Sequence, residues 1–122
     1  MNLLAARQRA VDRLTALGQR EMHGQDPLEV LGSAGATDWD CLTAAARLAL
    51  QGRREGLPVF RQVLDAPGYA ASASGLEVGL AALGLALLEG GDALERLEAL
   101  KVWPHNGLDV DLAAALTLAR GL

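Results

Sequence analysis

Two stretches in the second half of the chain are nearly identical: GLEVGLAA begins at Gly75, and GLDVDLAA begins 32 residues later at Gly107. A near copy at a spacing of this size is typical of repeat proteins, in which one supersecondary unit recurs and each copy packs on its neighbours. A third, more divergent copy is centred on Leu42, because Leu42, Leu80 and Leu112 are each followed by alanines. The sequence therefore predicts stacked units that share one continuous core.

The apolar residues are of a kind that favours helix. Hydrophobic residues make up 51% of the 122 residues, aromatic residues only 3%, and most of the apolar residues are leucine and alanine. Leucine and alanine have high helix propensity, whereas strands favour β-branched and aromatic residues. We expect a single all-α domain that spans residues 1–122 and has enough apolar residues for a buried core.

Glycine, proline and aspartate divide the chain into about seven expected helices. Asp26 precedes Pro27 as an N-cap, Asp92 has the same place after a Gly-Gly pair, and Pro58 fits a first helical turn. The expected helices cover residues 3–17, 27–31, 38–51, 55–64, 76–89, 92–101 and 108–120. Longer Ala-rich helices alternate with shorter ones, which predicts an α-solenoid of about three helical hairpins and a closing C-terminal helix.

The segment 76–89 is apolar nearly all round, so we expect it at the centre of the structure. Its apolar run is too short to cross a bilayer, and no membrane contact is expected. Because equivalent residues of a repeat lie on equivalent faces, Val78 and Leu80 should share a core with Val110 and Leu112.

Two strings resemble HEAT repeats of the short bacterial kind: DCLTAAARLALQGRREGLPVFRQVLDAP and GLEVGLAALGLALLEGGDALERLEAL. The matching positions are Val78, Ala81, Ala82, Leu83, Gly84, Gly91, Asp92, Ala93 and Leu94, with Leu57 and Pro58 in the preceding unit. The arginine that usually follows the valine in that family is replaced by Gly79 and Asp111. Tetratricopeptide repeats are the competing resemblance, although their bulky aromatic positions are missing. Either resemblance implies a non-catalytic scaffold or adaptor that binds a protein or peptide partner.

No catalytic constellation is present in the sequence. His23 and His105 are the only histidines, and neither has a second metal ligand at helical spacing. Cys41 is the only cysteine and is predicted on the apolar side of a helix, where a buried structural thiol is the simpler interpretation. We therefore expect no enzyme activity, no cofactor and no metal. A lone cysteine and the lack of a signal-peptide pattern favour the cytoplasm.

Charge is distributed unevenly along the chain. Residues 1–20 contain four arginines and one aspartate, whereas the rest contains 14 acidic and seven basic residues. An acidic body repels nucleic acid at long range, so a nucleic-acid partner is disfavoured. The arginines of the first helix are expected to face solvent.

Acidic residues gather at or near the start of the long helix of each unit. They are Asp38 and Asp40, then Glu77, then Asp109 and Asp111. One interpretation is helix capping and a favourable interaction with the helix dipole. The other is that stacking aligns Asp40, Glu77 and Asp109 along one edge, which would receive a basic segment of a partner.

Aromatic residues and the last helix supply the remaining candidates for partner binding. Trp39, Tyr69 and Trp103 fall in or beside predicted connections, where each either covers a helix end or anchors a partner. The last helix is apolar on more than one face, so Leu116 and Leu118 are either tucked between neighbouring helices or contact a partner or a second copy in a homodimer.

The leading functional hypothesis is a partner-binding scaffold or adaptor. Three alternatives stay open at this point. The first is a small export-type chaperone that shields a self-assembling subunit. The second is a nucleic-acid-binding module similar to HEAT-like DNA glycosylases. The third is a lyase-like enzyme subunit similar to bilin lyases.

Overall fold

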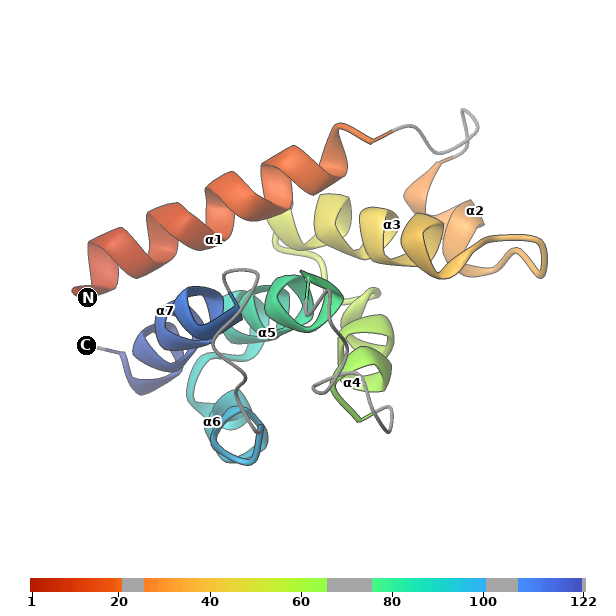
Figure 1. Cartoon of the computed structure of the whole chain (residues 1–122). Coiled ribbons are helices and arrows are strands. Elements are labelled where there is room, and N and C mark those ends of the chain that lie inside the picture. The colour runs from red at the N-terminus through yellow and green to blue at the C-terminus, as the bar shows by residue number, and fades with distance from the viewer. Residues whose placement is uncertain (21–25, 66–75, 101–107, 122) are drawn as a thin grey trace.

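The computed structural model describes residues 1–20, 26–65, 76–100 and 108–121, and every regular element within them is a helix (Figure 1). The chain is therefore all-α, as predicted. The elements are α1 (Leu3–Gly18), α2 (Pro27–Leu31), α3 (Asp38–Leu50), α4 (Leu57–Asp65), α5 (Leu76–Glu89), the 3-10 helix η1 (Gly90–Ala93), α6 (Leu94–Glu98) and α7 (Leu108–Arg120). None of these helices is long and apolar enough to cross a membrane.

Local signals explain why the helices begin where they do. The Asp26 carboxylate accepts a hydrogen bond from the Leu28 N–H at 2.9 Å, and Pro27 begins α2 as predicted. Thr37 and Asp40 form a capping box at the start of α3, with bonds of 3.1 and 3.3 Å. Each bond satisfies a backbone N–H that would lack a partner at a helix start.

The predicted N-cap role of Asp92 is wrong. The segment 92–101 was expected to be one helix, but the structure has η1 followed by the shorter α6, with Ala93 at the N-cap and no side-chain cap. Gly90 adopts a left-handed φ of 57° after α5, and the chain turns at once into η1. Asp92 therefore lies inside the 3-10 helix, where its side chain is not placed to cap α6.

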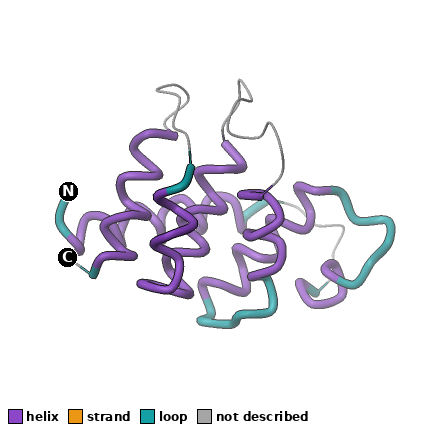
Figure 2. Tube along the Cα trace, turned by 90° about the horizontal axis from the view of Figure 1, so that it is seen from below, coloured by secondary structure: helices purple, strands orange, loops and turns teal. Residues whose placement is uncertain are grey.

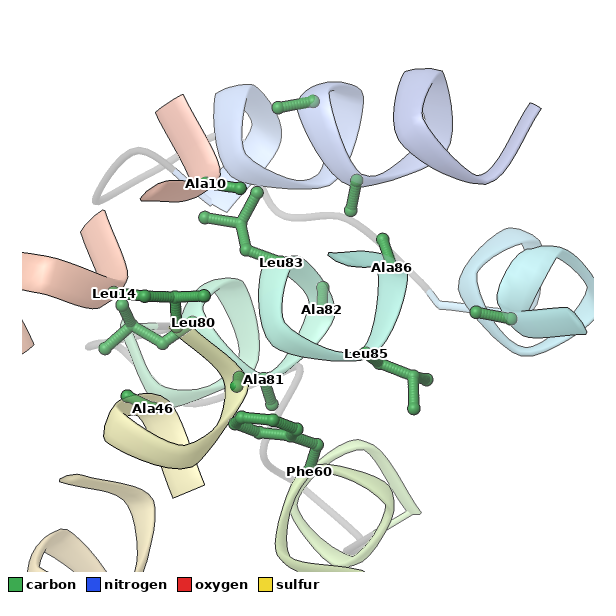
Figure 3. Close-up of a cluster of buried hydrophobic side chains, with 14 of the residues drawn as sticks. Ala10, Leu14, Ala46, Phe60, Leu80, Ala81, Ala82, Leu83, Leu85 and Ala86 are labelled. Carbon is green, nitrogen blue, oxygen red and sulfur yellow. The ribbon is translucent and has the colours of Figure 1, made fainter. Parts of the chain in front are cut away.

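Helix α5 is at the centre of the structure, as its all-round apolar sequence predicts. It contacts α1, α3, α4 and α7, and residues 78–86 are all buried. In Figure 3, Leu80 faces Leu14 of α1 while the Phe60 ring of α4 lies against Ala81. Residues 78–86 of α5 are covered by neighbouring helices on every side, which explains why this part of the helix has no polar face.

Helices α5 and α7 pack closely and run in the same direction. A Cβ added to Gly79 would lie 2.5 Å from Oδ2 of Asp111, and one added to Gly91 would lie 3.6 Å from the carbonyl oxygen of Ala119. Gly79 therefore allows a close approach that a side chain would obstruct, whereas a Cβ at Gly91 would make only an ordinary contact. The parallel direction agrees with the repeated strings, while the full solenoid of equivalent hairpins stays a prediction.

The expectation of a shared core is correct for Leu80 and Leu112 and wrong for Val110, while for Val78 only its burial is confirmed. Val78, Leu80 and Leu112 are buried, and the two leucines belong to the main core cluster, whereas Val110 is 38% exposed. The reason is position in the fold. Helix α7 is covered mainly by α1, α5, α6 and η1, so one side of it faces solvent, unlike the corresponding side of α5.

Helix α1 crosses α3, α5 and α7 and covers the core with an apolar stripe of Ala6, Ala10, Leu14 and Leu17. Figures 1 and 2 show the start of α1 and the end of α7 at the same end of the molecule. Leu3 has the helical spacing to continue this stripe, but it is 39% exposed. It lies in the first turn of α1, beyond the part of the helix that covers the core.

Candidate partner-binding groove

Two adjoining hollows run beside α1. The first has a volume of about 470 Å³, and its lining includes Leu3, Leu4, Arg7, Ala86, Leu87 and Leu118. The second has a volume of about 340 Å³, and its lining includes Arg7, Val11, Ala49, Leu50, Leu87 and Leu88. Arg7 and Leu87 line both hollows, so we treat the two as one surface and call it the terminal groove.

The side of the terminal groove formed by α1 follows from helical spacing. Leu4, Arg7 and Val11 are three and four residues apart and therefore form one stripe, adjacent to the stripe that packs into the core. The Asn2 side chain caps the helix by accepting a hydrogen bond from the Ala5 N–H at 2.7 Å. This cap places Leu3 and Leu4 in the first helical turn, at the end where α7 finishes.

Large apolar side chains are unusually exposed along this groove. Leu4 is 76% exposed, Leu3 is 39% exposed and Leu50 is 38% exposed. Isolated exposed leucines are common on protein surfaces, but these three line adjoining hollows. A contiguous exposed apolar surface of this kind usually marks an interaction site.

Two arginines of α1, Arg9 and Arg13, are half-buried and make ion pairs with α7, whereas they were predicted to face solvent. Arg9 Nε lies 2.7 Å from Oδ1 of Asp111, and Arg13 Nη2 lies 3.0 Å from Oδ2 of the same carboxylate. Asp111 is only 1% exposed. We call Arg9, Arg13 and Asp111 the α1–α7 ion-pair cluster. It holds α1 against α7, because a buried carboxylate requires charged or hydrogen-bonding partners.

Arg20, which follows α1, is exposed and makes a further ion pair, whereas Arg7 makes none with the described residues. Arg20 Nη1 donates a hydrogen bond of 3.0 Å to Oδ1 of Asp40. Arg7 is exposed and has no hydrogen bond or ion pair within the described part of the chain. Among the described residues that line the terminal groove, Arg7 is also the only charged one.

The predicted row of acids does not form a continuous exposed surface. Asp40 is 6% exposed, and its carboxylate is engaged by Arg20 and the Thr37 N–H. The Arg20 hydrogen bond, followed by that of Thr37, holds the pKa of Asp40 below its usual value. Asp109 is exposed at the start of α7, and Glu77 is half-buried on α5. None of these three acids lines the terminal groove, so none of them belongs to the site proposed below.

The predicted aromatic anchors give no exposed site among the described residues. Trp39 is half-buried and packs against the main core, which was one of its two interpretations. Tyr69 and Trp103 lie outside the described residues, as do His23 and His105.

The one cysteine lies beside a separate hollow. Cys41 and Asp38 are among the residues that line this hollow of about 320 Å³. Burial raises the pKa of the Cys41 thiol, and the charges of Asp38 and Asp40 raise it further. A raised pKa lowers the thiolate fraction at neutral pH, so this environment does not activate a nucleophile. The described residues contain no cluster of three or more His, Cys, Asp or Glu side chains suited to a metal ion.

The C-terminal leucines predicted as contacts have different positions. Leu116 and Leu118 are both half-buried and pack against the core, and Leu118 also lines the first hollow.

Sequence reasoning did not identify Leu4 or Arg7 as part of a site. The Leu3-Leu4 pair at a helix start was the available signal, since two adjacent leucines cannot both face the core from a helix end.

Comparison with known proteins provides no relative from which to transfer a function. No protein-family model matches the chain, and neither the curated proteins nor the solved structures contain a match. The resemblance to HEAT repeats stays a prediction based on the quoted strings.

Proposed function

We propose that the protein is a non-catalytic helical module that binds an apolar segment of a protein partner in the terminal groove. The observation that carries this proposal is the exposure of Leu3, Leu4 and Leu50 beside adjoining hollows of about 470 and 340 Å³. Covering such side chains removes apolar surface from water, which favours association. An adaptor role, as the HEAT-like strings imply, is the form of this function that we favour.

The described lining of the groove supports binding over chemistry. It consists of apolar residues, glycines and Arg7, with no acid, histidine or cysteine that could act as a general base or nucleophile. The nucleic-acid alternative loses support because Arg9, Arg13 and Arg20 are engaged by carboxylates of the same chain. The carboxylates compensate the positive charge of these arginines, which weakens their attraction for phosphate groups.

Capture of partners by chemical cross-linking in the native host tests the proposal. Leu4→Gln should abolish recovery of a protein that the wild-type chain captures, because it places an amide in the apolar groove. Leu28→Gln is the matched control, since Leu28 is 40% exposed on α2 and is not among the residues lining the groove. Circular dichroism should show that both variants are folded. Equal capture by wild type and by folded Leu4→Gln would refute the proposed site.

A further inference from the structure

We infer that the occupant of the terminal groove is an amphipathic helix of a partner protein that presents an acidic side chain to Arg7. This inference rests on the proposed function and adds the chemistry of the partner. Two observations carry it: the two-part shape of the groove, and the charge of Arg7, which has no ion pair with the described residues. The repulsion that would oppose a second copy of the chain is a further argument.

The spacing of the hollows suits a helix. Leu4 lines the first hollow and Val11 lines the second, with Arg7 between them in both. On α1 these two residues are separated by about 10.5 Å along the helix axis, or two turns. A helix lying alongside α1 would bring apolar side chains at positions i and i+7 to the same spacing, one for each hollow.

A helix is also the form of peptide that needs no backbone partners. An extended peptide binds most readily by adding a strand to an exposed sheet edge, and the described residues form no sheet. A helix satisfies its own backbone hydrogen bonds and contributes an apolar face. That face matches a groove lined mostly by leucine, alanine and valine side chains.

The charge of the groove selects an acidic partner. Arg7 is the only charged residue in the described lining and, unlike Arg9, Arg13 and Arg20, has no ion pair with any described residue. The first turn of α1 contains no acidic residue, so the positive end of its dipole is not neutralised there by a carboxylate. A glutamate or aspartate between the two apolar anchors would form a charge-assisted hydrogen bond with Arg7.

The same charge argues against a second copy as the occupant. A symmetric dimer brings identical patches together, so two terminal grooves packed face to face would place one Arg7 near the other. The described groove lining has no carboxylate to compensate that repulsion. Electrostatic complementarity therefore favours a different protein with an acidic helix.

Selection from a displayed library of helical peptides tests the inference. The peptides have about 18 residues, or five turns, with leucine at positions i and i+7 and random residues at the flanking positions. Wild-type protein should enrich glutamate and aspartate beside the leucines, whereas Arg7→Glu should enrich lysine and arginine. Arg96→Glu is the charge control, because it makes the same charge change on α6, away from the groove, and should select acids as wild type does. Because Arg96 pairs with Asp65, circular dichroism should first show that this variant is folded.

Binding of the best acidic peptide, measured by fluorescence anisotropy, provides the quantitative test. Arg7→Glu should weaken binding by roughly fivefold or more, since an exposed attraction becomes a repulsion of similar size. Leu4→Gln should weaken it by about tenfold through the loss of apolar burial.

Three results would overturn the inference. Selection of the same acids by wild type and Arg7→Glu would refute the role of Arg7. No enrichment of helical peptides would refute the helix, while leaving the Leu4-dependent capture described above as a separate test of the groove. Light scattering that detects a dimer of the wild type that Leu4→Gln converts to monomer would identify a second copy as the occupant.

Discussion

Replacing Asp111 with alanine should destabilise the protein by about 2 to 3 kcal/mol. The carboxylate is 1% exposed and accepts one hydrogen bond from Arg9 and one from Arg13, at 2.7 and 3.0 Å. Each charge-assisted bond contributes about 1.5 to 3 kcal/mol. Both arginine side chains are about one-third exposed and can turn towards water when the carboxylate is lost, which reduces the total. Urea unfolding followed by far-UV circular dichroism measures the change.

The arginine variants should differ from each other. The Nε atom of Arg13 is buried and has no hydrogen-bond partner among the described residues, which destabilises the folded protein. Replacing Arg13 with alanine removes this unfavourable contribution together with the ion pair. We therefore expect Arg9→Ala to destabilise the protein more than Arg13→Ala. Asp109→Ala is the control, because Asp109 is exposed on the same helix and should contribute only about 0.5 kcal/mol through the helix dipole. An Asp111→Ala effect no larger than that of Asp109→Ala would refute a stabilising α1–α7 ion-pair cluster.

Three further predictions concern the core, a capping carboxylate and the thiol. Gly84→Ala should lower stability by about 1 to 3 kcal/mol in thermal unfolding, because the added methyl group would overlap the Phe60 ring, and adding Phe60→Leu should recover part of the loss. The Arg20 hydrogen bond lowers the pKa of Asp40, so the Asp40 carboxylate stabilises the fold at pH values above its unfolded pKa of about 3.8. This stabilisation disappears as the pH falls through the pKa of Asp40 in the folded protein. In acid titrations of stability, Asp40→Asn should remove this part of the pH dependence. Burial raises the pKa of the Cys41 thiol, so iodoacetamide should label it slowly at neutral pH and faster in urea, and equal rates in both would contradict the burial.

The helices could be predicted from sequence because their limits depend on nearby residues. Pro27 and the Asp26 cap determine the start of α2, and Gly90 follows the last residue of α5. The wrong N-cap prediction for Asp92 also has a local cause in the sequence. Two successive glycines allowed a 3-10 turn that a simple N-cap pattern does not distinguish from the start of an α-helix.

The candidate site was harder to predict because it depends on contacts between distant segments. Asp111 and Asp40 had the same local pattern as Asp109, an acid at a helix start. Two of them are ion-paired because distant arginines reach them: Arg9 of α1 reaches Asp111, and Arg20, just after α1, reaches Asp40. Leu4 became part of a groove because α1 extends past the core it covers. Hydrophobic spacing predicts that a residue lies on a helix face, but not whether another helix reaches it.

The ion pair between α1 and α7 has a consequence for synthesis of the protein. Arg9 and Asp111 are separated by 102 positions, so the carboxylate that holds α1 is translated 102 residues after its arginine partner. At ribosomal elongation rates this delay is about 5 to 20 s. During that interval the apolar stripe of α1 can pack on α3, where Arg47 donates to the carbonyl oxygen of Gly18, but α7 is missing. The nascent chain therefore exposes part of its core until α7 has left the ribosome.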